Sequence, residues 1–205
     1  MSEATNMNKL AFGAKPTVLR CSRCGKFVDW EDARLQVVCG CRPHLDLPPV
    51  LVRDAEERDR RAVNDLFQRD FGRTRLVAFG EEMHLDREQA IVAEMEGEIA
   101  GALAHREFRG ALHIIALATD PMWQRSGVGA YLVAEAELIA RNAKLPKVLV
   151  ATTNDNLPAL YFYQRRGYRI SEVLAGAVPD HFGEPASVGF GGIPIRDEIH
   201  LEKEV

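Results

Sequence analysis

A short segment in the middle of the chain combines residues that could hold a phosphate group. It runs from Leu117 to Gly129 and reads LATDPMWQRSGVG. An apolar run ends at Asp120-Pro121, and Gly127 and Gly129 stand where a helix is expected to begin. Helix N-termini carry unpaired N–H groups and the positive end of the helix dipole, and glycine lets a ligand approach the backbone closely. The segment therefore predicts phosphate binding by backbone amides, with Arg125 adding a charged contact.

The glycine spacing excludes two common nucleotide-binding turns. A dinucleotide-binding turn would need G-x-G-x-x-G, and a P-loop would need Gly-Lys-Ser/Thr; the sequence has neither at this position. A lone G-x-G also recurs as a glycine-rich helix start without a ligand. The residues around the G-x-G therefore have to decide whether it binds a phosphate group.

The cysteines form a second candidate site, near the N-terminus. All four lie in two close pairs, Cys21/Cys24 and Cys39/Cys41, with fourteen residues between the pairs. Two such pairs suit one tetrahedral zinc ion with a structural role, since four protein ligands leave no open position for catalysis. The second pair is C-x-C instead of the commoner C-x-x-C, so His44 stays open as an alternative fourth ligand. Free or disulfide-bonded cysteines are the competing interpretation.

Candidates for a proton-accepting group are spread along the chain. His113 has an imidazole whose ordinary pKa suits a base near neutral pH. It shares strand parity with Ile115 and Leu117, which favours a packed or hydrogen-bonded histidine over a base. Four acidic residues and one further histidine are other candidates, although each is more typical of a solvated surface charge and a chain of waters could accept the proton instead. These candidates are Glu81, Glu82, Asp180, His181 and Glu184.

Hydrophobic periodicity predicts the elements that must position these groups. Strands are expected at 50–53, 90–95, 99–108, 112–118, 148–152, 168–174 and 198–203. Helices are expected at 54–69, 81–87, 127–142 and 157–166. The order β-α-α-β-β-β-α-β-α-β-β predicts an α/β (α+β) domain with a mixed, mostly antiparallel central sheet and helices on both faces.

Two motifs together indicate a family. Gln124-Arg-Ser-Gly-Val-Gly129, after a strand and Asp-Pro, resembles the Q/R-x-x-G-x-G/A signature of the GNAT N-acetyltransferase superfamily. One strand later, Asn156-Leu-Pro-Ala-Leu-Tyr-Phe-Tyr-Gln-Arg-Arg-Gly-Tyr168 resembles that family's N-x-x-A-x-x-h-Y-x-x-x-G-F/Y motif. The resemblance covers roughly residues 50–205 and leaves the cysteine segment outside.

The resemblance implies acetyl-CoA as co-substrate, an amine as acceptor and a set of cofactor contacts. Its two central strands, here near 112–119 and 147–153, separate and admit the pantetheine arm between them. Backbone groups of Leu117, Ala118 and Thr119 would then pair with that arm, and Asn156 would contact it from the next helix. The pyrophosphate would lie on the turn and first residues of the helix, formed by Gln124, Arg125, Ser126, Gly127, Val128, Gly129 and Ala130.

The resemblance also implies that Tyr163 is the general acid. A phenol can protonate the strongly basic CoA thiolate as it leaves. A backbone N–H near Leu117 would stabilise the oxyanion. Tyr161 competes for the role of acid, but two residues turn a helix by about 200°, so only one of the two tyrosines can face the cofactor. A core aromatic is the alternative reading of Tyr163.

Composition limits location and partners. The formal net charge is −4, and residues 1–47 carry seven basic and five acidic side chains, which gives no reason to expect nucleic acid. No apolar stretch approaches the length of a membrane span, and Met1 to Lys15 lack the apolar run of a secretory signal, so no membrane partner and a cytoplasmic location are expected. A homodimer stays open, because the long loop between residues 176 and 194 could cover a small amine or contact a second copy.

The sequence therefore predicts a leader at 1–19, a zinc-ribbon-like segment at 20–47 and a GNAT-like domain at 48–205. The expected function is acetyl transfer from acetyl-CoA to a primary amine by direct attack, since no cysteine lies in the catalytic part. Two alternatives are a non-catalytic CoA-sensing module, in which the zinc segment recruits a protein or nucleic acid, and an enzyme that transfers a larger acyl group. The sequence does not identify the acceptor, which could be a small molecule or a protein.

Overall fold

The computed structural model describes residues 19–20, 27–28, 49–124, 126–178 and 187–205. The chain divides into two compact units, residues 1–47 and 48–205. In the first unit, β1 (Leu19–Arg20) pairs antiparallel with β2 (Phe27–Val28). Several predicted site residues lie outside the described residues. They are Cys21, Cys24, Cys39, Cys41, His44, Arg125, Asp180, His181 and Glu184.

The second unit is built on a seven-stranded sheet. Its strands are β3 (Leu51–Asp54), β6 (Gln89–Met95), β7 (Glu98–Phe108), β8 (Ala111–Thr119), β9 (Lys147–Thr153), β10 (Arg169–Leu174) and β11 (Glu198–Glu204). They lie in the order β10-β11-β9-β8-β7-β6-β3, and every neighbouring pair is antiparallel except β8 and β9. The predicted mixed, mostly antiparallel sheet is confirmed.

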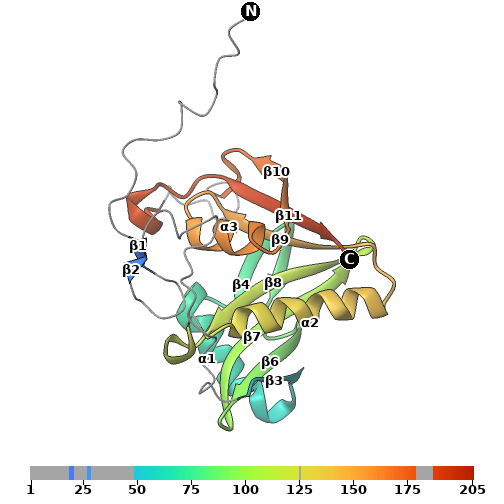
Figure 1. Cartoon of the computed structure of the whole chain (residues 1–205). Coiled ribbons are helices and arrows are strands. Elements are labelled where there is room, and N and C mark those ends of the chain that lie inside the picture. Colours follow the sequence, from blue (N-terminus) through green and yellow to red (C-terminus); the bar gives the residue numbers. More distant parts are fainter. Residues whose placement is uncertain (1–18, 21–26, 29–48, 125, 179–186) are drawn as a thin grey trace, which may run out of the picture. The chain divides into compact units, whose positions relative to one another are not determined.

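Helices cover both faces of this sheet, as predicted (Figure 1). One face packs against α2 (Val128–Asn142) and α3 (Leu157–Gln164), whose buried side chains include Leu132, Val133 and Tyr163. The other face packs against α1 (Arg60–Phe71) through Val63, Leu66 and Phe67. Among the helices of the described residues, none is long and apolar enough to cross a membrane.

The helix predicted at 81–87 is wrong. That stretch belongs to a β-hairpin, in which β4 (Arg75–Ala78) pairs with β5 (Glu81–His84). Glu-Glu-Met-His favours a helix by propensity, but tertiary packing overrides such preferences. Met83 and Leu85 are fully buried on the α1 face of the sheet, so the hairpin takes the place of a second helix there.

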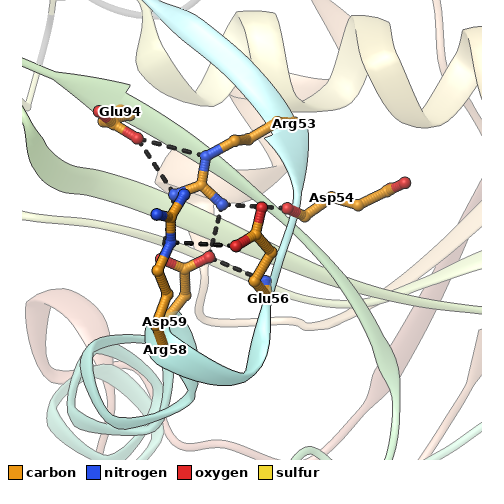
Figure 2. Close-up of polar contacts among 6 residues, drawn as sticks. All are labelled: Arg53, Asp54, Glu56, Arg58, Asp59 and Glu94. Atoms are coloured by element: carbon orange, nitrogen blue, oxygen red, sulfur yellow. Dashed lines mark hydrogen bonds and ion pairs between the residues drawn. The ribbon is translucent and has the colours of Figure 1, made fainter.

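A partly buried cluster of charged side chains joins β3 to the start of α1. Arg53 on β3 donates two hydrogen bonds to Asp59, at 2.5 and 3.0 Å, and two to Glu94 on β6, at 3.1 and 3.2 Å. Figure 2 shows the guanidinium lying between the two carboxylates. Asp59 also accepts the backbone N–H of Glu56. These bonds, the one from Arg53 above all, lower the pKa of Asp59 to about 2.

Candidate active site

The two central strands separate beyond a short paired stretch. Parallel pairing of β8 with β9 covers only the three pairs from Leu112–Val148 to Ile114–Val150. Beyond Ile114, β8 continues as far as Thr119 with β7 as its partner, and β9 continues with β11 as its partner. Within the described residues, the end of β8 therefore has a β-partner on one edge only, which leaves its other edge available to a ligand.

A β-bulge stands where this separation begins. On β7, Ala104 and His105 are adjacent, but their partners on β8 are Ala116 and Ile114, so Ile115 is an extra residue. Bulges bend a strand and end its pairing with a neighbour. The bulge also corrects the parity that the sequence implies: Ile115 packs on the α1 face, whereas Leu117 packs on the α2 face.

The predicted phosphate turn leads into α2 as expected from its glycines. Gly127 adopts a φ of 97° before the helix, and within the described part of the chain no side chain caps that end of α2. Such an end exposes N–H groups that can donate hydrogen bonds to an anion. Ser126 bonds back to the Trp123 carbonyl through its hydroxyl, so its side chain braces the turn. Gln124 is exposed, Val128 is buried in the core, and Ala130 follows on the first turn.

Three elements that carry the motifs meet at Gly129. A Cβ at this position would lie 3.4 Å from the ring of Phe162 on α3 and 3.8 Å from Leu117 on β8. Glycine therefore lets the start of α2 approach both elements closely. The Thr119 carbonyl accepts a hydrogen bond from Arg69 of α1. The Asp120 N–H bonds to the Ala100 carbonyl of β7, so by alternation Leu117 and Thr119, and not Ala118, direct their backbone groups toward the free edge.

Gly101 on β7 is a site residue that sequence reasoning missed. A Cβ there would lie 2.7 Å from Val128 Cγ1 and 2.9 Å from the Ala118 carbonyl oxygen, closer than side chains tolerate. Only glycine lets the first residue of α2 pack against β7 and β8. A glycine inside a strand pattern signals such a close approach and could have revealed it.

The short helix α3 presents its two tyrosines differently. Tyr163 is buried, its ring contacts Phe162 and Tyr168 edge-on, and burial raises the pKa of its phenol. Tyr161 is 60% exposed. Asn156 caps the helix by accepting the Ala159 N–H, and its side chain is otherwise exposed. Tyr163 is thus the tyrosine of the pair that faces the protein interior, on the α2 side of the sheet.

His113 lies on the opposite face of the sheet. It is 4% exposed, and its Nδ1 makes no hydrogen bond to any described residue. Burial, followed by the nearby charge of His200, lowers the pKa of His113 to about 4. The imidazole is therefore neutral near pH 7 and has a ring nitrogen able to accept a proton. Of the other candidates, Glu81 forms an ion pair with Arg109 and Glu82 forms one with Arg75, both at the surface.

A second histidine, which sequence reasoning also missed, lies near His113. His200 on β11 contacts Glu198 through Nε2 at 2.5 Å and Glu172 through Nδ1 at 3.1 Å. Burial alone would lower the pKa of His200, but the hydrogen bond to Glu198 and the two carboxylate charges together raise it. The spacing of Glu198 and His200 on one strand places both on one face, a signal that the sequence did carry.

The segment between β9 and α3 fastens the loop that precedes β11. The Asn154 side chain accepts the backbone N–H groups of Arg196 and Asp197, at 2.8 and 3.0 Å. The buried carboxylate of Asp155 accepts the N–H of Phe190 at 3.0 Å. The described part of this loop is therefore anchored directly beside the start of the helix that carries Tyr163.

Comparisons with known proteins agree with this architecture. Residues 53–168 match the model of the acetyltransferase (GNAT) family. The uncharacterized protein YxbD of Bacillus subtilis is 30% identical over 147 residues, which are 70% of this chain and 91% of that protein. Two solved structures have a similar fold. A Bacillus subtilis acetyltransferase in complex with CoA has 21% identity and a TM-score of 0.63, and the match covers 77% of this chain and 99% of that one. An IAA acetyltransferase from Bacillus cereus has 23% identity and a TM-score of 0.61, and the match covers 77% of this chain and 100% of that one. With its separated central strands and glycine-led helix, the chain belongs to the acetyltransferase (GNAT) family and is an acyltransferase that uses acetyl-CoA.

Proposed function

We propose that the protein transfers the acetyl group of acetyl-CoA directly to a primary amine, with Tyr163 as general acid and His113 as general base. The observation that carries this proposal is the arrangement around the bulged end of β8. The two candidate groups lie on opposite faces of the sheet, Tyr163 on the α2 side and His113 on the α1 side. Proton donation to the departing sulfur and proton removal from the amine would thus fall to two different residues, one on each face.

The residues around the turn fit a CoA-type ligand. The N-terminal N–H groups of α2, led by Gly127, would donate hydrogen bonds to the pyrophosphate, with Arg125 as the adjacent cation in the sequence. The free edge of β8 at Leu117 would pair with the amides of the pantetheine arm, and a backbone N–H there would stabilise the oxyanion. Asn156 would contact the arm through the part of its side chain that helix capping leaves free.

Protons balance in the proposed transfer. The amine nitrogen forms a bond to the acetyl carbon, and His113 takes one proton from that nitrogen. The carbon–sulfur bond breaks as Tyr163 gives its phenolic proton to the departing sulfur, which leaves as the CoA thiol. Near pH 7 the raised pKa leaves Tyr163 protonated, with a proton to give, and the lowered pKa leaves His113 neutral. Both groups then exchange protons with water.

Acetyl-CoA-dependent thiol release across a panel of amines and peptides tests this function. With an acceptor that the wild type uses, Tyr163→Phe should lower kcat by about 100-fold or more, the usual worth of a positioned acid. Tyr161→Phe is the matched control, because this tyrosine is exposed and should leave kcat unchanged. Equal rates for Tyr163→Phe and wild type would remove Tyr163 as the acid. Cofactor binding, seen as a raised Tm, without thiol release from any acceptor would contradict the transfer itself.

We propose separately that the cysteine segment binds one structural zinc ion. The support is the pattern of Cys21, Cys24, Cys39 and Cys41, whose two close pairs match the spacing of tetrahedral zinc sites. So short a segment has little core of its own and would gain its folding free energy from the metal.

A further inference from the structure

The tip of the β4–β5 hairpin carries an unexpected residue. Phe79 and Gly80 form the two-residue turn, with φ values of 56° and 72°. Turns of this kind favour Asn, Asp or Gly at the first position, because a bulky side chain is strained at positive φ. Phenylalanine at this position is locally unfavourable, so its ring is expected to make contacts that offset the strain.

The ring of Phe79 contacts both histidines of the α1 face. Its centroid lies 4.5 Å from that of His113, with the rings stacked at 28°, and 4.5 Å from that of His200. Phe79 is itself half-buried, whereas His113 is almost fully buried. The Phe79 ring therefore covers one face of the imidazole of His113, and the Phe108 ring contacts that imidazole edge-on, with 5.5 Å between the centroids.

A buried carboxylate holds the hairpin tip in this place. Glu198 accepts the backbone N–H of Phe79 at 2.8 Å, and the same oxygen contacts His200 at 2.5 Å. His200 also contacts Glu172 on β10. The tip is thus tied to the strands beside the separated pair by a backbone hydrogen bond as well as by ring contacts.

We propose that Phe79 is a specificity-determining residue: its ring covers His113 and restricts the base to slender primary amines, whose amino carbon carries no branch. This inference rests on the proposed function, because it takes His113 as the base. A branched amino carbon would need the space that the ring occupies, whereas an unbranched amine can approach the imidazole past the ring edge. The backbone anchor at Glu198 keeps the ring from moving aside with the hairpin.

The variant Phe79→Asn removes the ring without harming the turn, because asparagine suits a positive φ at this position. Thiol release is measured with n-butylamine and sec-butylamine, which differ only in branching at the amino carbon. The ratio of kcat/KM values for branched against unbranched amine should rise about tenfold or more, the usual worth of a steric contact of this size. KM for acetyl-CoA should stay unchanged. Phe71→Leu, which alters a ring on α1 that contacts Phe67, is the control and should leave the ratio alone.

A second readout needs no turnover. Diethylpyrocarbonate modifies accessible neutral imidazoles, and trypsin releases His113 alone among histidines in the peptide 110–125. In Phe79→Asn this peptide should be modified at least about tenfold faster than in wild type, if the ring is the cover. The peptide 88–106 should stay unmodified in both proteins, because its only histidine, His105, is buried in another part of the core.

The outcomes separate the two proposals. An unchanged modification rate of His113 in Phe79→Asn overturns the covering role, whatever the activity. A faster modification with an unchanged amine ratio overturns the role in specificity while leaving acetyl transfer intact. A third outcome combines faster modification of His113 in Phe79→Asn with a wild-type protein that acetylates no amine of the panel. That outcome contradicts the proposed function but not the covering of His113 by Phe79.

Discussion

Replacing Gly101 by alanine should weaken acetyl-CoA binding more than the chemistry of transfer. The added Cβ would meet Val128 Cγ1 at 2.7 Å, the Ala118 carbonyl oxygen at 2.9 Å and Leu132 Cδ1 at 3.2 Å. Side-chain rotation can relieve the first and third contacts, but the second is to backbone. Some relief must therefore come from a shift of β7 against β8, and the start of α2 moves with it.

The magnitude follows from two opposing effects. Overpacking of this kind lowers the free energy of unfolding by about 1–3 kcal/mol. Replacing glycine also reduces the conformational entropy of the unfolded chain, which raises the free energy of unfolding by about 0.4–1 kcal/mol. A net destabilisation of about 1–2 kcal/mol is expected in urea unfolding. Val128 is the first residue of α2, so the same shift should misplace the N–H groups of the phosphate turn. A tenfold rise in KM for acetyl-CoA corresponds to about 1.4 kcal/mol.

The assay is thiol release with acetyl-CoA varied at a saturating amine concentration. Val63→Ala is the control, because it removes buried volume on α1, on the opposite face of the sheet, at a similar cost of about 1–2 kcal/mol. It should lower stability without raising KM for acetyl-CoA. A Gly101→Ala protein with wild-type stability and wild-type KM would refute the reasoning from the close contacts at Gly101.

Two further predictions concern the rest of the molecule. Asp59→Asn should lower the free energy of unfolding at pH 7 by about 2 kcal/mol, the worth of lowering the Asp59 pKa from 3.8 to about 2. Because the folded-state pKa is lowered, this contribution is complete above about pH 4 and is lost as the pH falls through about 2. The free energies of unfolding in urea should therefore converge for the two proteins over that range. A difference in unfolding free energy that stays constant with pH would contradict the assignment. Metal analysis of protein purified with zinc should find about one zinc per chain, and Cys24→Ser should lose it. Four thiols that react freely before any chelator is added would count against the metal site.

Much of the fold follows from local sequence patterns. The turns at Glu96-Gly97 and Arg109-Gly110 both take positive φ values, and the strands on either side form β6, β7 and β8 as expected. The apolar strands and the glycine-led helix likewise lie where periodicity places them. These features are local, so a short window of sequence contains their physical cause.

The features that were missed depend on contacts between distant segments. The hairpin at β4 and β5 forms because Met83 and Leu85 fill the α1 face, which outweighs the helix preference of its residues. The bulge at Ile115 depends on the register between two strands, which alternation within one strand cannot reveal. The contact of Phe79 with His113 joins a turn to a strand more than thirty residues away, so no motif contains it.

The extra residue in β8 means that the number of residues in this strand, and not only their types, affects the function. Without Ile115, His105 and Ala104 would still face Ile114 and Ala116, so every other side chain of β8 would keep its face. A deletion of this one codon would therefore alter neither the hydrophobic pattern nor the pairing with β7. It would instead remove the bend that separates β8 from β9. The two strands would then pair along the stretch where the pantetheine arm is expected to bind. In the evolution or redesign of this scaffold, an enzyme and an inert relative could thus differ by a single deletion that no comparison of side chains would flag.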